Sequence, residues 1–483
     1  MTVERGLVPP PTTGEALHRS ISALADGQPL LSSRQTTVRW QRAALGAAVV
    51  LLALGLALAP ADTGIFLMGV ATVCYVVNLI DRTWLFATGV ERSPELRIAA
   101  DDALAFPDEQ LPIYTVLVPA YREPGVVVRL IRDLSSIDYP PDKLEIKLLL
   151  EDDDLATILA VQQALADTVL LADLVLVPAA EPRTKPKACN FGLQFATGEF
   201  ITIYDAEDIP EPLQLRRAAM AFRSLPDEVA CIQAKLSYHN DRQNLLTRWF
   251  TSEYNQWFGY TLPGLMAAAA PIPLGGTSNH IRTATLLELG GWDPYNVTED
   301  ADLGIRLWRA GHQTAILDSV TLEEANSDVI NWLRQRSRWY KGYLQTFLVH
   351  SRQPVLLKRQ VGWTGMLRFA SVTLGPPFVS LCNLAFWTLT LMWVMGAPSF
   401  IRTVFPMVLF YPAIVSLVLG NASIICCGLI AARVDRKPYL LTATLTIPCY
   451  WLLMSIAAVK AVLQLVLQPS YWEKTEHGLD ANA

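Results

Sequence analysis

The sequence contains few charged residues and no surplus of basic ones. Only 17% of its 483 residues are charged, and the formal net charge is −6 at pH 7. Domains that bind DNA or RNA usually carry a basic surface, because they must neutralise phosphate groups. The charge balance therefore gives no reason to expect a nucleic-acid partner.

The sequence also lacks cysteines at the spacing of a metal site. Its seven cysteines are scattered, and Cys426 and Cys427 stand side by side within an apolar run. Structural zinc sites draw their thiolates from closely spaced pairs that are separated by a few residues. We interpret these cysteines as small buried apolar residues rather than as metal ligands or disulfide partners.

What the sequence has in excess is apolar residues, which make up 52% of the chain. They are concentrated in long blocks toward the two ends, whereas the middle carries most of the charge. A helix needs about 20 residues to cross roughly 30 Å of hydrocarbon. Five uncharged runs of about this length or longer predict five transmembrane helices, at residues 43–61, 63–80, 369–401, 403–432 and 438–459.

The basic residues near these runs indicate the orientation of the chain. Three arginines lie at residues 34–42, before the first run, and Arg433, Arg436 and Lys437 lie between the fourth and fifth runs. Short loops rich in Lys and Arg stay on the cytoplasmic side of a membrane. We therefore expect the charged middle of the chain to be cytoplasmic.

These patterns divide the chain into six segments. The expected order is a flexible cytoplasmic N-terminus (1–40), two transmembrane helices (41–90), a cytoplasmic domain (105–345), interfacial helices (346–368), about three transmembrane helices (369–468) and a C-terminal tail (469–483). Helices along the membrane surface would bring the cytoplasmic domain close to the spans.

Strand-like and helix-like segments alternate in the cytoplasmic domain. Residues 113–118, 145–150 and 200–204 are short apolar runs, and acidic residues follow the second and third of them. Such alternation predicts an α/β fold with a mainly parallel, Rossmann-like sheet that is covered on both faces. Ligands bind at the carboxyl edge of such a sheet, where both acidic groups are expected to lie.

The acidic group after the third run has the composition of a metal site. Asp205, Glu207 and Asp208 follow the strand directly, and their hard oxygen ligands suit Mg²⁺ or Mn²⁺. The alternative is that they cap the helix that begins beyond Pro210, because acidic residues favour helix starts.

Two further motifs carry chemistry. Glu299 and Asp300 belong to a second acidic group, in which a carboxylate could act as a general base, or could cap a helix. The stretch from Gln335 through Arg338 to Trp339 is strongly basic, so that Arg could pair with phosphate and Trp could stack on a sugar. The alternative is a basic helix that meets acidic lipid headgroups.

Taken together, and in this order, these motifs resemble those of the processive family-2 glycosyltransferases, such as cellulose and hyaluronan synthases. The matching segments are Pro-Ala-Tyr-Arg-Glu at 119–123, the acidic cluster at 151–154, Asp-Ala-Glu at 205–207, Thr-Glu-Asp at 298–300 and Gln-Arg-Ser-Arg-Trp at 335–339. The likeness covers about residues 111–348 by motif and the flanking spans by architecture. It implies a GT-A fold in the cytoplasmic domain and a location in a bacterial inner membrane.

The resemblance also implies a binding site for the nucleotide of a UDP-sugar donor. Asp153 and Asp152 would bind the uracil, and Tyr121 and Glu123 would frame it. Lys185 lies in a segment, Lys-Pro-Lys-Ala-Cys-Asn, that looks like the family's Lys-Ala-Gly…Asn segment and would lie near the donor diphosphate. The alternative for this lysine is a solvated position.

The remaining roles follow from the same resemblance. Asp300, with Glu299 beside it, would be the catalytic base. Asp205 and Glu207 would hold Mg²⁺ or Mn²⁺, although the family's usual motif has Asp at the second position. Gln335 and Arg338 would hold the diphosphate, and the acceptor would be bound by Trp339, Thr277 and Ser278. The segment around Thr277 lacks the Phe-Phe-Cys-Gly-Ser motif of cellulose synthases, which argues against cellulose as the product.

The sequence therefore predicts an inverting, processive enzyme that elongates a β-linked glycan from UDP-glucose or UDP-N-acetylglucosamine. We expect the later spans to provide an export path, with an accessory export subunit as a candidate partner. One alternative is a non-processive enzyme that glycosylates a membrane lipid, because lipid glucosyltransferases share the Gln-x-x-Arg-Trp motif. The other is a transporter or scaffold without activity. The length of the product distinguishes the processive enzyme from the lipid-glycosylating one.

Overall fold

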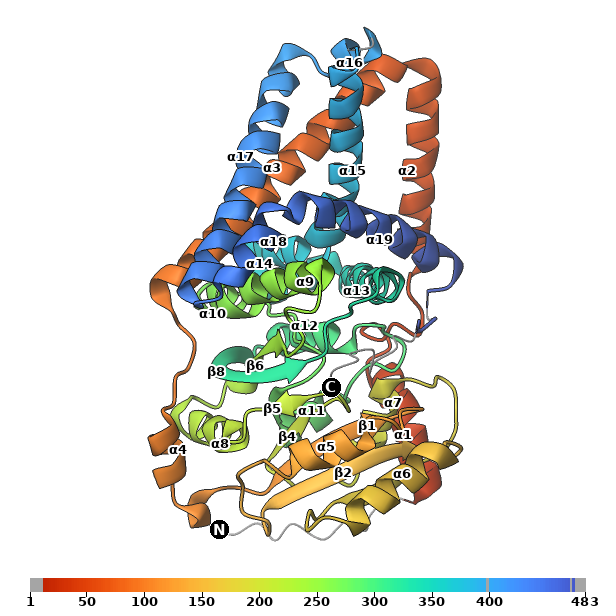
Figure 1. Cartoon of the computed structure of the whole chain (residues 1–483). Coiled ribbons are helices and arrows are strands. Elements are labelled where there is room, and N and C mark those ends of the chain that lie inside the picture. Colours follow the sequence, from red (N-terminus) through yellow and green to blue (C-terminus); the bar gives the residue numbers. More distant parts are fainter. Residues whose placement is uncertain (1–11, 397–398, 470, 474–483) are drawn as a thin grey trace.

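The structure, a computed structural model, describes residues 12–396, 399–469 and 471–473. Residues 1–11 of the expected N-terminal segment and 474–483 of the expected tail lie outside the described residues. Figure 1 shows three levels: a sheet domain, a layer of helices that includes α9 (Leu245–Gln256), α13 (Val329–His350) and α14 (Pro354–Thr373), and long helices beyond that layer.

The sheet domain is built on eight strands in the order β3-β2-β1-β4-β7-β6-β8-β5. The first four are parallel, as the sequence predicts, whereas β7 is antiparallel to both of its neighbours and β5 is antiparallel to β8. The sheet is therefore mixed, with four parallel strand pairings and three antiparallel ones. The strands are β1 (Tyr114–Ala120), β2 (Leu144–Glu151), β3 (Asp173–Val177), β4 (Phe200–Ile203), β5 (Ile209–Pro210), β6 (Val229–Tyr238), β7 (Asn279–Arg282) and β8 (Gln313–Glu323).

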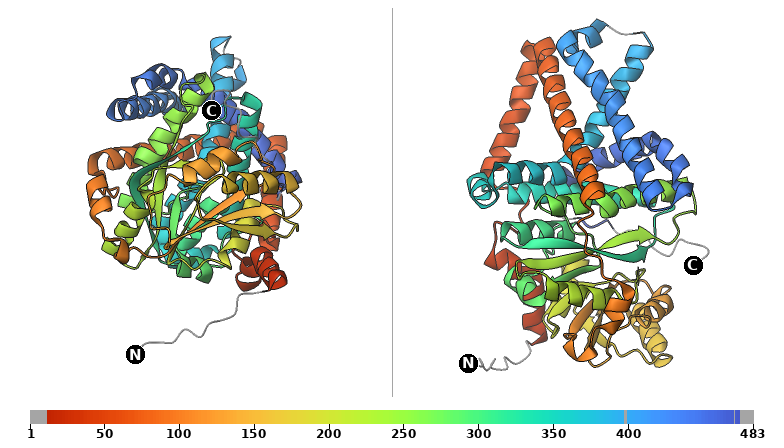
Figure 2. Two further views of the ribbon diagram at one scale, coloured as in Figure 1. Left: turned by 60° about the horizontal axis from the view of Figure 1, so that its bottom comes forward. Right: turned by 90° about the vertical axis from the view of Figure 1, so that its left-hand side faces the viewer.

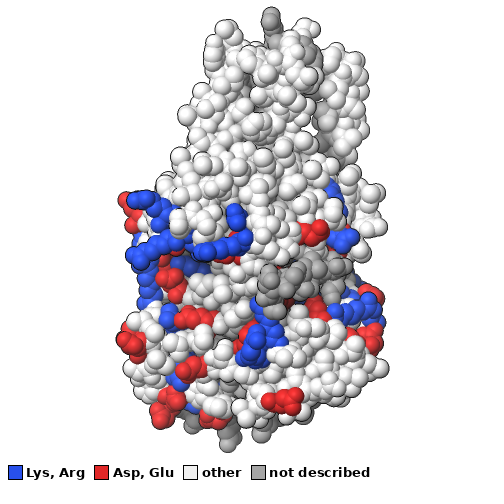
Figure 3. Space-filling model, viewed as in Figure 1, with Lys and Arg blue, Asp and Glu red and all other residues white. Residues whose placement is uncertain are grey.

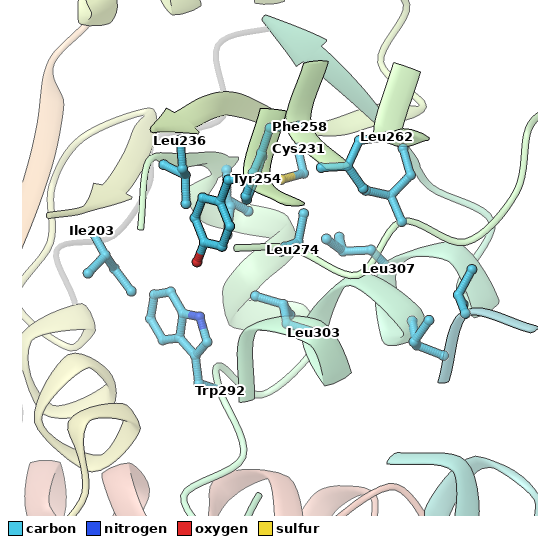
Figure 4. Close-up of a cluster of buried hydrophobic side chains, with 14 of the residues drawn as sticks. Ile203, Cys231, Leu236, Tyr254, Phe258, Leu262, Leu274, Trp292, Leu303 and Leu307 are labelled. Carbon is cyan, nitrogen blue, oxygen red and sulfur yellow. The ribbon is translucent and has the colours of Figure 1, made fainter. Parts of the chain in front are cut away.

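Both faces of the sheet are buried under apolar side chains. Leu117 of β1 belongs to one apolar cluster, while Val116 and Val118 belong to a second, because successive side chains of a strand point to opposite faces. Figure 4 shows part of the first cluster, where side chains of β6 meet those of α12. The covering helices are α5 (Val127–Leu134), α6 (Leu155–Ala166), α7 (Lys185–Leu193), α8 (Gln214–Ser224), α11 (Thr283–Glu288) and α12 (Glu299–Arg309).

The described part of the N-terminal segment is ordered, which corrects the expectation of a flexible segment. Helix α1 (Thr13–Gly27) begins with a capping box between Thr12 and Glu15. Its Ala16, Ser20 and Leu24 are buried, and the Ser20 carbonyl accepts a hydrogen bond of 3.1 Å from Asn190 of α7. The segment is ordered because it covers α7, which a local sequence pattern does not reveal.

Five helices are long and apolar enough to cross a membrane: α2 (Arg39–Leu58), α3 (Pro60–Arg92), α15 (Gly375–Val394), α17 (Met407–Val434) and α19 (Ile447–Leu467). Only 6% to 33% of the most apolar window of each is buried within the protein, so most of their surface faces outward, as lipid-facing helices require. On the face drawn in Figure 3, charged side chains are scattered over the sheet domain and the adjoining helical layer, whereas the far part of the long helices shows none.

The fifth apolar helix is arranged differently from the other four. Helices α2, α3, α15 and α17 project away from the sheet domain, whereas α19 lies across their base, above α13 (Figures 1 and 2). The apolar run at 438–459 is split by the short α18 (Leu441–Leu445), after which α19 begins. Its length fits the prediction of a fifth span, but its direction sets it apart from the others.

Candidate active site

A cavity of about 600 Å³ extends from the carboxyl edge of the sheet to the base of the projecting helices. Residues from β1, α7, α12 and α13 line one part of it, and residues from α3, α15 and α19 line the other. Ten of the predicted site residues line this cavity: Tyr121, Glu123, Lys185, Asp205, Glu207, Glu299, Asp300, Gln335, Arg338 and Trp339.

The predicted uracil-binding residues lie at the sheet end of the cavity. Asp153 accepts a 2.6 Å hydrogen bond from Arg183, which also donates to the Tyr121 hydroxyl at 3.3 Å. Asp152 accepts from the backbone N–H of Ala179 and thereby fixes the neighbouring loop. Neither aspartate lines the cavity itself, whereas Arg183 does. The sequence analysis missed Arg183, and its place two residues before Lys185 was the available signal.

Lys185 joins the two acidic groups that the sequence singled out. Its ammonium lies 2.5 Å from the Asp205 carboxylate and donates to the Gly276 carbonyl at 2.8 Å. Burial lowers the pKa of Lys185, but the carboxylates of Asp205 and Glu299 raise it more, so that its pKa lies above the ordinary lysine value. The ammonium is therefore a fixed positive charge between the acidic groups.

The second acidic group lies at the first turn of α12, with the Asp300 carboxylate beside Gly276. A Cβ atom at Gly276 would lie 3.4 Å from Asp300 Oδ2, so the glycine leaves room around this oxygen. Burial raises the pKa of Asp300 above the ordinary aspartate value, although the Ala301 N–H, Lys185 and Arg338 oppose the rise. Burial and the charge of Asp300 together raise the pKa of Glu299. A raised pKa makes a carboxylate a better proton acceptor near neutral pH.

Helix α13 places its basic motif along the cavity wall. The Arg338 guanidinium lies 4.7 Å from the centre of the Trp472 ring, and its Nε is buried with no hydrogen-bond partner among the described residues. Gln335 accepts a hydrogen bond of 2.9 Å from Asn326. Arg338 thus has donor capacity left for an anionic ligand.

Thr277 and Ser278 do not line the cavity, which corrects their assignment to the acceptor site. Both are buried: Thr277 donates to the Ile203 carbonyl and to the Asp208 carboxylate, and Ser278 donates to Thr321. Asp208 in turn accepts from the Asp205 N–H at 2.7 Å. These side chains hold the loop that carries Asp205, while Gly275 and Gly276 form the cavity wall at this point.

Two family models match this region of the chain. The model for glycosyl transferase family group 2 matches residues 200–419, and the model for glycosyl transferase family 2 matches residues 115–273. Taken together, residues 115–419 match models of family-2 glycosyltransferase domains. Both models describe enzymes, so the comparisons favour an enzyme over a transporter or scaffold without activity.

Curated relatives of this glycosyltransferase are distant. The probable glycosyltransferase YdaM of Bacillus subtilis is 27% identical over 255 residues, which cover 52% of this chain and 60% of YdaM. The beta-monoglucosyldiacylglycerol synthase of Synechocystis is 25% identical over 330 residues, covering 64% of this chain and 66% of that enzyme. The chain thus spans less than two thirds of the length of the relatives it matches.

The fold is similar to that of a solved glycosyltransferase. The mannosyltransferase PcManGT from Pyrobaculum calidifontis, determined with GDP-Man and Mn²⁺, aligns with a TM-score of 0.50 and 18% identity. The alignment covers 83% of this chain and 99% of PcManGT. The prediction of a GT-A fold is confirmed.

The cavity offers two carboxylates that fit a divalent metal ion. Among the residues that the structure describes, no group of three or more His, Cys, Asp or Glu side chains is placed to hold a metal by itself. Asp205 and Glu207 both line the cavity. Mg²⁺ is commonly held by one or two carboxylates together with substrate phosphates, so two protein ligands are sufficient.

Proposed function

We propose that this glycosyltransferase transfers a hexose from a UDP-sugar, UDP-glucose or UDP-N-acetylglucosamine, to a hydroxyl of a nascent glycan and so elongates a β-linked polysaccharide. The observation that carries the proposal is the single cavity that joins the acidic groups to the base of the membrane helices. Through this cavity, an acceptor can reach the acidic groups from the level of the bilayer.

The proposed reaction is one inverting displacement. Asp300 accepts the proton of the acceptor hydroxyl, the hydroxyl oxygen bonds to the anomeric carbon, and the bond from that carbon to the diphosphate breaks. UDP leaves with the bonding electrons, and Lys185 and Arg338 stabilise its negative charge. A divalent cation bound by Asp205 and Glu207 would supply further positive charge to the diphosphate.

The lining of the cavity at the membrane end supports a glycan acceptor. Asn78 of α3 and Asn383 of α15 are polar residues that line this end, and Tyr343 and Trp451 are aromatic residues that line it. Asn383 is 7% exposed, and its Oδ1 has no hydrogen-bond partner among the described residues. Sugars offer hydroxyls to amides and apolar ring faces to aromatic side chains. A cavity for acyl chains alone would not need these amides.

The second candidate function is glycosylation of a membrane lipid. The Synechocystis relative is named as a beta-monoglucosyldiacylglycerol synthase, and two further relatives carry the same name. Val372, Ile424 and Met454 give the same cavity an apolar side, which suits an acyl chain. In both cases we propose a multi-pass enzyme of a bacterial inner membrane with its catalytic domain in the cytoplasm. An accessory export subunit belongs to the polysaccharide proposal alone.

The deciding experiment measures product size. The protein, reconstituted in lipid bilayers, is incubated with a panel of UDP-sugars and with Mg²⁺ or Mn²⁺, and both UDP release and products are recorded. The Asp300→Asn variant is the control, and its turnover should fall by about 10²-fold or more with donor affinity retained.

Each outcome assigns the activity differently. A long glycosidase-sensitive polymer that the variant does not make supports the polysaccharide proposal. Products that partition with lipid and carry one or two sugars support lipid glycosylation instead. Full turnover by Asp300→Asn contradicts the assignment of the base in both cases.

A further inference from the structure

Arg336 is a buried cation in an aromatic surrounding, and the mechanism above does not use it. Its side chain is 7% exposed. The guanidinium carbon lies 5.2 Å from the ring centre of Phe250, 5.3 Å from that of Trp332 and 4.7 Å from that of Trp339. A cation within about 6 Å of an aromatic face is attracted by the ring, more strongly where water is excluded.

Glu253 of α9 balances this charge. Two nitrogens of Arg336 donate to its two carboxylate oxygens, Nη1 to Oε1 at 2.8 Å and Nη2 to Oε2 at 2.5 Å. Such a paired geometry fixes the plane of the guanidinium as well as its position. Because Arg336 also lies against the Trp339 ring, the position of Glu253 determines where that ring can lie.

Tyr450 of α19 completes the group. Its hydroxyl donates to Glu253 Oε2 at 2.7 Å and accepts from Arg336 Nη2 at 3.1 Å. Its ring also packs against Trp332, with 4.9 Å between the ring centres. One hydroxyl therefore connects α19, which lies across the base of the projecting helices, to both partners of the ion pair.

Arg336 and Arg338 serve different parts of the cavity, although they are two residues apart. Arg338 is close enough to Glu299 and Asp300 for their charges to act on its pKa, whereas the partners of Arg336 are Glu253 and Tyr450. Trp339 follows directly on the chain, and like Arg336, Glu253 and Tyr450 it lines the cavity. The group formed by Arg336, Glu253 and Tyr450 therefore lies beside Trp339 in the cavity wall.

We propose that Arg336, Glu253 and Tyr450 are positioning residues that hold Trp339 in place for the acceptor and link its position to helix α19. The proposal rests on the proposed function, because it takes Trp339 as an acceptor-binding residue. The three side chains act through Trp339 and not on the reacting atoms. Their loss should impair the use of the acceptor and leave the binding of the nucleotide unchanged.

The test compares variants that change one contact each, in the full chain reconstituted in lipid bilayers. Glu253→Gln removes the charge that balances Arg336, and because it leaves a buried cation it can also unfold the protein. Tyr450→Phe removes only the hydroxyl and keeps the ion pair. Arg336→Lys keeps the charge without the planar fork. Tyr260→Phe is the matched control. The Tyr260 hydroxyl donates a hydrogen bond of 2.7 Å to Asp435, and neither residue lines the cavity.

Three quantities are measured: UDP affinity, the ratio of sugar transferred to sugar hydrolysed, and backbone hydrogen exchange of residues 335–343. We expect Glu253→Gln and Arg336→Lys to lower the ratio about tenfold or more, since small displacements at a reacting site cost large factors. Tyr450→Phe should lower it less. All three should exchange faster over residues 335–343 with UDP affinity unchanged, and Tyr260→Phe should match the wild type.

The outcomes separate this proposal from the proposed function. If the three variants keep the wild-type ratio, or exchange over residues 335–343 as slowly as the wild type, the positioning role is wrong. If they lose UDP affinity as much as transfer, the group supports the whole fold rather than Trp339. If the wild type itself transfers no sugar, the proposed function fails, and the hydrogen exchange still decides whether the group holds this part of α13.

Discussion

At the scale of single residues, Lys185 lies between the two acidic groups of the cavity. It contacts Asp205, and its charge acts on Glu299 and Asp300. In the proposed reaction, a cation in this position would stabilise both the ionised base and the leaving diphosphate. This dual position is a property of the folded chain, because 20 residues separate Lys185 from Asp205 and more than 110 separate it from Asp300.

The pH dependence of the reaction should report the raised pKa of Asp300. The base must be ionised to accept a proton, so activity falls as the pH is lowered through its pKa. Because burial raises that pKa, the acid limb of kcat/KM should lie above about pH 4, the ordinary aspartate value. The profile is measured with saturating metal, and UDP affinity over the same range controls for protonation of the donor. An acid limb at or below the ordinary aspartate pKa would contradict the argument that burial raises the pKa of Asp300.

Residue positions were predictable where a side chain stands at the end of an element, and not where packing decides. Asp205 and Asp300 line the cavity, as expected, because a strand end and a helix start place them at the carboxyl edge of the sheet; their roles stay predictions. Thr277 and Ser278 were misassigned, because only the three-dimensional structure shows that they are buried against β4 and β8. Arg183 was missed, since its partner Asp153 lies 30 residues earlier.

At the scale of elements, glycines make the contact between α3 and the consecutive helical segments η2 (Trp257–Thr261) and α10 (Leu262–Ala267). A Cβ atom at Gly89 would lie 2.0 Å from the Tyr260 carbonyl oxygen of η2, and one at Gly264 of α10 would lie 2.0 Å from the Leu85 carbonyl oxygen. The backbones therefore touch, as small residues allow at helix crossings. This contact fixes α3, which carries Asn78 into the cavity, against the sheet domain.

The Gly89→Ala variant should separate these elements. The added methyl group cannot be accommodated without a shift of the backbone, and overpacking of this kind costs about 1–3 kcal/mol. We expect a lower thermal unfolding temperature in lipid nanodiscs and slower transfer. Gly46→Ala is the control, because a Cβ at Gly46 of α2 meets nothing within 4 Å. Equal unfolding temperatures for the two variants would contradict the close contact.

The helices show why sequence patterns predict that an element exists better than they predict where it packs. The apolar runs predict long helices correctly, since length and composition are local properties. The direction of α19 depends on its packing against α13 and α15, and no local signal carries it. Helix α1 was missed for the same reason, because its order derives from its contact with α7.

At the scale of the whole molecule, Arg352 ties the segment before α2 to the end of α13. Its Nη1 donates to the carbonyls of Pro29, Leu30 and Ser32 at 3.0 to 3.2 Å, and Nη2 donates to that of Gln35. Arg352 itself is 5% exposed. One side chain thus joins the N-terminal segment and the helical layer at the base of the projecting helices.

Replacing Arg352 by Met should release this segment. Hydrogen bonds from a charged donor contribute about 1.5–3 kcal/mol each, and several are lost together. We expect a lower unfolding temperature and faster proteolytic cleavage between residues 28 and 38. Arg132→Met is the control, because that side chain is 72% exposed on α5. Cleavage at the wild-type rate would show that other contacts hold the segment.

The shared cavity has a consequence for the order in which the protein is made. Its wall includes α3, which leaves the ribosome early, and α19, the last helix that the structure describes. The acidic groups lie between α3 and α19 in the sequence, so they are synthesised before the part of the cavity wall that α19 forms. A ribosome-bound chain that stops short of α19 therefore carries the acidic groups without the finished wall of the cavity. Under the proposed function, sugar transfer would begin only after synthesis has passed α19.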